Sequence, residues 1–217
     1  MKPVPTHFWH TLPLHYVPHL LASGILFSQD ALQARGLPIR PRATAAQRDR
    51  RLGVSRFVHL SFTAKTPLLA DKRIKGYPHA LITFDAALSA SETAAYLPYN
   101  TKSWRHRDDF VPIYDREAKA ALIQQWRGGR YPSAELLIET MLPLIPHGAA
   151  LHLASEEEAA WLCGLIAFLG IKPPLPICVS PEQFPPGLSL NLDAHNSYAE
   201  ACRASGSLLP PPNVTFD

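Results

Sequence analysis

Proline is the residue type that most constrains how this chain folds. The sequence of 217 residues contains 22 prolines but only 11 glycines. Each proline fixes its own backbone angle and lacks an amide hydrogen, so it ends or bends a regular element. We therefore expect short helices and strands that end often and are joined by stiff loops.

The rest of the composition predicts a folded chain with a proper core. Hydrophobic residues make up 47% of the sequence and charged residues 18%, which argues against wholesale disorder. The length favours one domain over residues 1–207, with a proline-rich tail over 208–217. No apolar run approaches the roughly 20 residues of a membrane span, and residues 1–10 lack the apolar stretch expected of a signal peptide. We expect a cytoplasmic monomer with no membrane partner.

Strand-like and helix-like segments interleave, but they do not form regular β-α-β units. Neither a Gly-x-Gly-x-x-Gly motif nor a Walker loop is present, so the two common nucleotide-binding folds are not indicated. Segments 36–56 and 97–113 are expected to be loops. We predict an α+β fold with short mixed or antiparallel sheets and flanking helices. The expected strands are 7–12, 57–63, 79–85, 134–139, 150–153 and 177–179, and the expected helices are 16–23, 29–35, 115–127 and 155–169.

Positive charge is concentrated between Arg35 and Arg56. This stretch holds seven arginines and a single acid, Asp49, although the net charge of the whole chain is only +3. Such a segment favours an anionic partner such as a phosphate, a dinucleotide or a nucleic-acid backbone. A solvated loop is the plainer alternative.

The residues that usually bind metals show no convincing pattern. The three cysteines are far apart and form no Cys-x-x-Cys pair, and no clear ligand set stands out among the ten histidines. A metal-dependent hydrolase is therefore the least favoured class, and we expect no metal.

Three short segments carry candidate chemistry. His10 and Thr11 interrupt an apolar strand and need partners, although a core histidine bonded to backbone would also satisfy this. Arg50 and Arg51 offer planar donor forks that suit phosphate or carboxylate. Glu135 stands among apolar residues, where its carboxylate is desolvated unless it faces a cleft or an arginine. An edge-strand acid facing water is the alternative.

Taken in order, the motifs resemble those of the DarT-type ADP-ribosyltransferases, which are nucleic-acid-modifying toxins. The resemblance covers roughly residues 8–165 and implies an ADP-ribosyltransferase-like fold. Its motifs are Trp-His-Thr-Leu at 9–12, Pro-His-Leu-Leu-Ala-Ser-Gly-Ile-Leu at 18–26, Arg-Arg-Leu at 50–52, Phe-Val-His-Leu-Ser-Phe-Thr-Ala-Lys-Thr-Pro-Leu at 57–68, and Ser-Ala-Glu-Leu-Leu-Ile at 133–138.

The resemblance implies roles for individual residues. Glu135 matches the catalytic glutamate, and Arg50 or Arg51 matches the active-site arginine, with Arg48 as a further alternative. The substrate NAD would be held by His10, Thr11, Leu12, His19, Arg50 and Arg51.

The resemblance also implies a reaction and partners. ADP-ribose would pass from NAD to a nucleobase of single-stranded DNA, and a macrodomain-type or other antitoxin would accompany the protein. The same transfer onto RNA and a decayed nucleic-acid-binding module are the alternatives. The loop before Glu135 interleaves aromatic and basic residues, which suits base stacking and backbone contact, or else simply covers the sheet. The residues expected to contact nucleic acid are Tyr99, Trp104, Arg105 and Arg107.

The sequence departs from the family pattern at several positions. Leu12 stands where the family has a threonine, and Leu60-Ser61-Phe62 stands where it has Phe-Tyr-Phe. Lys65-Thr66-Pro67-Leu68 replaces an Arg-Ser-Pro-Met turn. These changes leave the acceptor base open.

Overall fold

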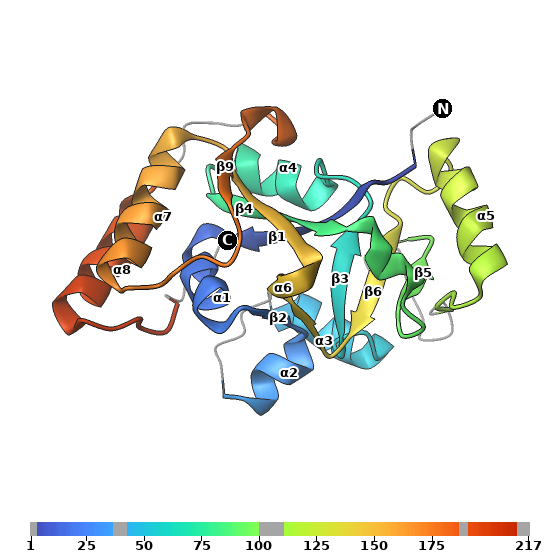
Figure 1. The fold of residues 1–217 in the computed structure, drawn as a ribbon, viewed down its shortest axis with the longest axis horizontal. Helices are drawn as coiled ribbons and strands as arrows, with labels where there is room; N and C mark the ends of the chain where they lie inside the picture. The colour runs from blue at the N-terminus through green and yellow to red at the C-terminus, as the bar shows by residue number, and fades with distance from the viewer. Residues whose placement is uncertain (1–3, 37–42, 100–110, 187–190, 212–217) are drawn as a thin grey trace. The chain divides into compact units, whose positions relative to one another are not determined.

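The computed structural model describes residues 4–36, 43–99, 111–186 and 191–211 (Figure 1). The described chain separates into two compact units. Unit 1 comprises residues 1–9, 26–62 and 84–142, and unit 2 comprises residues 10–25, 63–83 and 143–217. Four of the five boundaries between the units fall inside strands, namely β1 (His7–Pro13), β2 (Ile25–Phe27), β4 (His79–Asp85) and β7 (Met141–Pro143), and the fifth follows Phe62.

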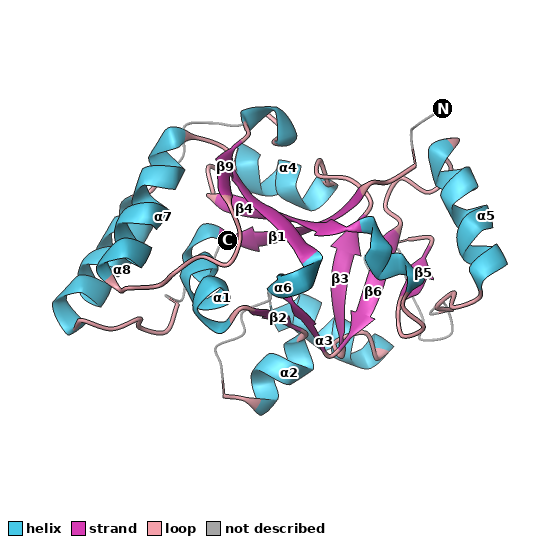
Figure 2. Cartoon of the chain, in the orientation of Figure 1, coloured by secondary structure: helices cyan, strands magenta, loops and turns pink. Residues whose placement is uncertain are grey.

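Unit 1 is built on antiparallel strands in the order β5-β6-β3-β1. Figure 2 shows these strands together with the helices of the unit. Asp115 and Ser28 cap α5 and α2 through their side chains, as short polar residues at a helix start commonly do. The elements are α2 (Gln29–Ala34), α3 (Ala43–Leu52), β3 (Phe57–Ser61), a 3-10 turn (Ala86–Ala90), β5 (Ala95–Leu97), α5 (Arg116–Arg127) and β6 (Glu135–Glu139).

The two faces of the unit 1 sheet bury different side chains, because neighbouring residues on a strand point to opposite sides. One face carries an edge-to-face aromatic cluster in which Phe62 lies 5.2 Å from Phe8, 5.1 Å from Tyr96 and 5.5 Å from Trp126 of α5, measured between ring centroids. The other face carries an aliphatic cluster that includes Leu97 and Leu137 together with Leu52, Val54, Phe57 and Ala95.

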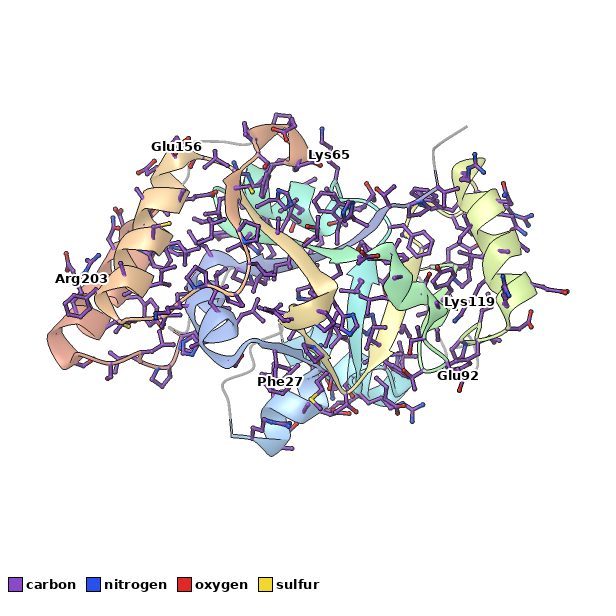
Figure 3. All side chains as sticks on the ribbon, in the orientation of Figure 1. Phe27, Lys65, Glu92, Lys119, Glu156 and Arg203 are labelled. Carbon is purple, nitrogen blue, oxygen red and sulfur yellow. The ribbon has the colours of Figure 1, made fainter. Side chains whose placement is uncertain are left out.

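Unit 2 contains the strand order β1-β4-β8-β9, in which β8 and β9 run parallel. Helix α7 contacts α1, α8, β8 and β9, and it begins at Glu156, which is labelled in Figure 3. The elements are a 3-10 turn (Leu14–Tyr16), α1 (Val17–Ser23), α4 (Pro67–Ile74), α6 (Leu144–His147), β8 (Gly148–Leu153), α7 (Glu156–Phe168), β9 (Ile177–Val179), a second 3-10 turn (Pro181–Gln183) and α8 (Asp193–Ser205).

A buried ion pair anchors α7 in unit 2. Arg73 on α4 donates to Glu158 over 3.0 Å, and the second carboxylate oxygen of Glu158 accepts from the Ala154 amide over 2.7 Å. Ser155 caps the helix by accepting from the Glu158 amide. Burial raises the pKa of Glu158, while these backbone and arginine contacts oppose the rise.

The predicted α+β class is confirmed, and so are all six predicted strands and all four predicted helices to within a few residues. The expectation of a loop over 36–56 is wrong, because residues 43–52 form α3. The run from Ala43 to Leu52 lacks glycine and proline and is rich in alanine and arginine, both good helix formers. Helices α4 and α8 were not predicted either. The single domain over 1–207 and the tail over 208–217 stay predictions.

Within the described ranges, every helix is too short or too polar to cross a membrane.

Unit 2 contains several buried histidines whose surroundings favour the neutral form. Burial lowers the pKa of His15 to about 3 and the pKa values of His79 and His195 to about 4. The cationic side chains of Lys72 and Arg73 lower the pKa of His79 further. The rings of His15, Trp161 and His195 pack together at centroid distances of 5.4 Å around His195.

These histidines predict a loss of stability in mild acid. In the unfolded chain these histidines bind protons near pH 6.5, whereas in the folded chain they do not. The free energy of unfolding therefore has its full value above pH 6.5 and decreases as the pH drops below 6.5. Each histidine contributes up to roughly 1 kcal/mol per pH unit. Urea unfolding between pH 7.5 and 5 measures the slope. His195→Phe should make it shallower, and His7→Phe, at an exposed position, should not. Equal slopes in both variants would contradict this assignment.

Candidate active site

Glu135 is the first residue of β6, and the strand register decides its surroundings. Ser61 of β3 and Leu97 of β5 lie directly opposite it on either side, and Trp9 of β1 lies opposite Ser61. Side chains of paired residues project from the same face of a sheet. Glu135 therefore shares the face that carries the aliphatic cluster, and its side chain is 15% exposed.

His59 is the polar partner of Glu135 on this face. It lies two residues before Ser61, so it is the diagonal cross-strand neighbour of the carboxylate. Its Nδ1 is 2.9 Å from Glu135 Oε2, and its Nε2 is 3.2 Å from the backbone oxygen of Val54. Both ring nitrogens thus face oxygen atoms.

The surroundings of His59 favour its protonated form. Burial by itself lowers the pKa of this imidazole, but the hydrogen bond and the charge of Glu135 raise it. The Val54 carbonyl and the charge of Asp49 raise it further, and the pKa of His59 ends above its ordinary value of 6.5. The two side chains consequently form an ion pair in which Nδ1–H donates to the carboxylate.

The turn between α3 and β3 places the Val54 carbonyl within hydrogen-bond distance of His59 Nε2. Gly53 follows the last residue of α3 with φ of 73°, a left-handed conformation that favours glycine at helix ends. The amide of Val54 then donates to the Asp49 carbonyl over 3.0 Å. Gln29 of α2 donates to the Asp49 carboxylate over 3.1 Å, which fixes this second acid.

The predicted arginines lie on the helix that leads into this turn. Arg50 and Arg51 occupy the last turn of α3, where positive charge complements the negative end of the helix dipole. Both side chains are exposed. Arg48 lies on the same helix, but its side chain is outside the described residues.

Two tyrosines and an arginine that precede Glu135 in the chain pack together. Tyr99 is two residues beyond Leu97, and Tyr131 is four residues before Glu135. Their rings meet edge to face at 5.1 Å, and the guanidinium of Arg130 lies 5.4 Å from the centre of the Tyr131 ring. Tyr99 remains 43% exposed. The predicted partners Trp104, Arg105 and Arg107 fall outside the described residues.

The structure brings Glu135, Arg50, Arg51 and Tyr99 into unit 1, whereas the other predicted NAD-binding residues belong to unit 2. His19 Nε2 lies 2.9 Å from the hydroxyl of Tyr198, which donates to the Leu209 carbonyl, and burial lowers the pKa of His19. The predicted NAD-binding residues in unit 2 are His10, Thr11 and Leu12 of β1 and His19 of α1. Of these, Leu12 is buried.

In the described part of the chain, no three His, Cys, Asp or Glu residues gather in a way that would hold a metal ion.

No protein-family model matches this chain, and no curated protein matches it. Solved structures do match. DarT from Thermus sp. 2.9 in complex with ADP-ribosylated ssDNA aligns with 85% of this chain and 99% of its own, at 13% identity and a TM-score of 0.64. The same protein in complex with NAD+ aligns at 12% identity with a TM-score of 0.63, over 85% of this chain and all of its own. The chain has a DarT-type fold.

A longer protein matches as well. Thermosipho africanus DarTG in complex with ADP-ribose aligns over 82% of this chain at 14% identity and a TM-score of 0.62. The present chain spans about half the length of that DarTG chain, since the alignment covers 50% of it. The resemblance inferred from the motif order is therefore confirmed at the level of the fold.

Sequence reasoning missed His59, the partner of Glu135, and the Arg130–Tyr131 pair that precedes Glu135 in the chain. His59, Arg130 and Tyr131 were not assigned to the site. A signal for His59 existed, because His59 and Ser61 alternate with Val58, Leu60 and Phe62 and so define a polar stripe on one strand face. The cross-strand register that joins this stripe to Glu135 is not visible in the sequence.

The turn beneath the site offers a direct test of this geometry. Gly53→Ala should lower the free energy of unfolding by about 1–2 kcal/mol, because alanine in a left-handed conformation is strained. Gly128→Ala is the matched control, since Gly128 ends α5 with φ of −75° and an added Cβ would lie 3.4 Å from its nearest neighbour. Urea unfolding of both variants measures the difference, and equal losses would contradict the assigned role of Gly53.

Proposed function

We propose that this chain is an NAD-dependent ADP-ribosyltransferase that modifies a nucleobase of single-stranded DNA. The observation that carries the proposal is Glu135, a mostly buried carboxylate at the start of β6 whose Oε2 is bound by His59. The matched DarT structures, described as complexes with NAD+ and with ADP-ribosylated ssDNA, support the same reaction for this chain.

The reaction needs a carboxylate in such a position. The bond between nicotinamide and the ribose C1′ breaks, nicotinamide leaves with the bonding electrons, and positive charge develops on the ribose as in glycoside hydrolysis. Glu135 accepts a hydrogen bond from a ribose hydroxyl and stabilises that charge. A nucleobase nitrogen then bonds to C1′ and loses its proton to Glu135 or to water, so atoms and charge balance.

The arginines suit the diphosphate of NAD. Arg50 and Arg51 present two exposed guanidinium groups on one helical turn, directly before the turn that carries Val54. Guanidinium forks bind phosphate oxygens in a bidentate manner that lysine does not reproduce. His10, Thr11, Leu12 and His19 are proposed to line the rest of the NAD site.

The aromatic pair suits the acceptor base. Tyr99 and Tyr131 present ring surface, and Arg130 adds positive charge for the nucleic-acid backbone. Stacking of bases on aromatic rings is tolerant of sequence and stabilises binding by about 1–3 kcal/mol per base. A base presented single-stranded reaches such a surface without the cost of leaving a duplex. We further propose that the modification is toxic and that an antitoxin, of the macrodomain type or another, counteracts it.

The carboxylate assignment has a matched control on the same strand. Glu135→Gln should lower kcat for transfer to single-stranded DNA by about 100- to 1000-fold, because the amide no longer stabilises the ribose cation. Glu139→Gln should stay within about twofold of the wild type. Glu139 projects from the same face of β6, but it is half exposed and pairs with Arg56 at 3.8 Å. Mass spectrometry of the oligonucleotide measures the transfer.

Two outcomes would contradict the proposal. Equal activity of Glu135→Gln and the wild type would remove Glu135 from the chemistry. Nucleic-acid binding by the wild type with NAD left intact would instead identify a decayed binding module.

A further inference from the structure

The two polar contacts of His59 require a hydrogen at each ring nitrogen, whereas a neutral histidine carries only one. The Val54 carbonyl only accepts hydrogen bonds, so Nε2 of His59 must carry a hydrogen to contact it at 3.2 Å. Nδ1 lies 2.9 Å from a carboxylate oxygen, and two unprotonated atoms would repel each other at that distance. A proton must therefore lie between His59 and Glu135 as well.

The charges around the pair favour placing that proton on the imidazole. Glu135 approaches from β6, and Asp49 of α3 acts on the ring as a second negative charge. The Gln29 amide donates to Asp49 and the Val54 carbonyl accepts from the ring, so both neutral neighbours are compatible with a cationic histidine. The result is an imidazolium bound to a carboxylate, with the proton shared between them.

This contact leaves Glu135 with one oxygen for a substrate. Oε2 is held by His59, whereas Oε1 makes no protein hydrogen bond within the portion of the chain that the structure places. A carboxylate tied at one oxygen to a neighbouring strand cannot rotate freely. The remaining carboxylate oxygen can accept a hydrogen bond from a ribose hydroxyl.

We propose that His59 is a positioning residue for Glu135. His59 shares one proton with the carboxylate and holds the carboxylate so that Oε1 is turned to the substrate. This inference rests on the proposed function of Glu135. It gives His59 no contact with NAD or with the acceptor, so its substitution should change kcat and leave the KM for NAD nearly constant.

A pH profile separates this role from simple packing. In the wild type, kcat should fall as the pH rises through the pKa of His59, because the charged donor is lost. His59→Asn places a neutral amide near the position of Nδ1, so kcat should be about tenfold lower and the alkaline fall attributed to His59 should vanish. His59→Leu removes the donor, and kcat should fall on the order of a hundredfold. Circular dichroism of both variants verifies the fold.

A second measurement does not depend on the activity. Imidazole ¹⁵N NMR should show His59 titrating above 6.5 in the wild type, and its pKa should fall in Glu135→Gln, where only the Val54 carbonyl and the Asp49 charge still oppose burial. An unchanged His59 pKa in Glu135→Gln would overturn the shared proton.

The two proposals fail in different ways. If the wild type transfers ADP-ribose and both folded His59 variants keep its kcat and its pH profile, the role of His59 is wrong and the proposed function stands. If the wild type transfers nothing from NAD, the proposed function is wrong, and the NMR titration still decides whether the proton is shared.

Discussion

The antiparallel register between β3 and β6 decides which groups surround Glu135. Pairing of Ser61 with Glu135 places His59 diagonally across from the carboxylate and puts both on the face that carries the aliphatic cluster. A slip of one residue would turn every side chain of β6 to the opposite face. Glu135 would then enter the aromatic cluster around Phe62 and lose its contact with His59. Burial of Leu136 and Tyr96 on that second face holds the register in place.

Most of the secondary structure was predictable because it depends on local signals. Proline and glycine mark the ends of elements, and caps such as Ser28, Asp115 and Ser155 act within four residues of their helix starts. Helix α3 was missed because its arginines were interpreted as a charged loop, although arginine is a good helix former. The position of Glu135 in a strand was predictable, but its partner was not, since 76 residues separate it from His59.

The departures from the family motifs fall at informative positions. Ser61 stands where the family carries a tyrosine, and it is the residue directly opposite Glu135. A small side chain there leaves the space beside the carboxylate less filled than a phenol ring would. Leu12 replaces a threonine and is buried.

The central claim is transfer of ADP-ribose from NAD to a base of single-stranded nucleic acid, and the acceptor itself gives the most direct test. The wild-type protein is incubated with NAD and separate pools of single-stranded DNA, duplex DNA and RNA, and each pool is digested and examined by mass spectrometry. We predict that one base of the single-stranded DNA gains the mass of one ADP-ribose while nicotinamide is released. A gain confined to RNA would correct the acceptor. No gain in any pool, with NAD intact, would contradict the account.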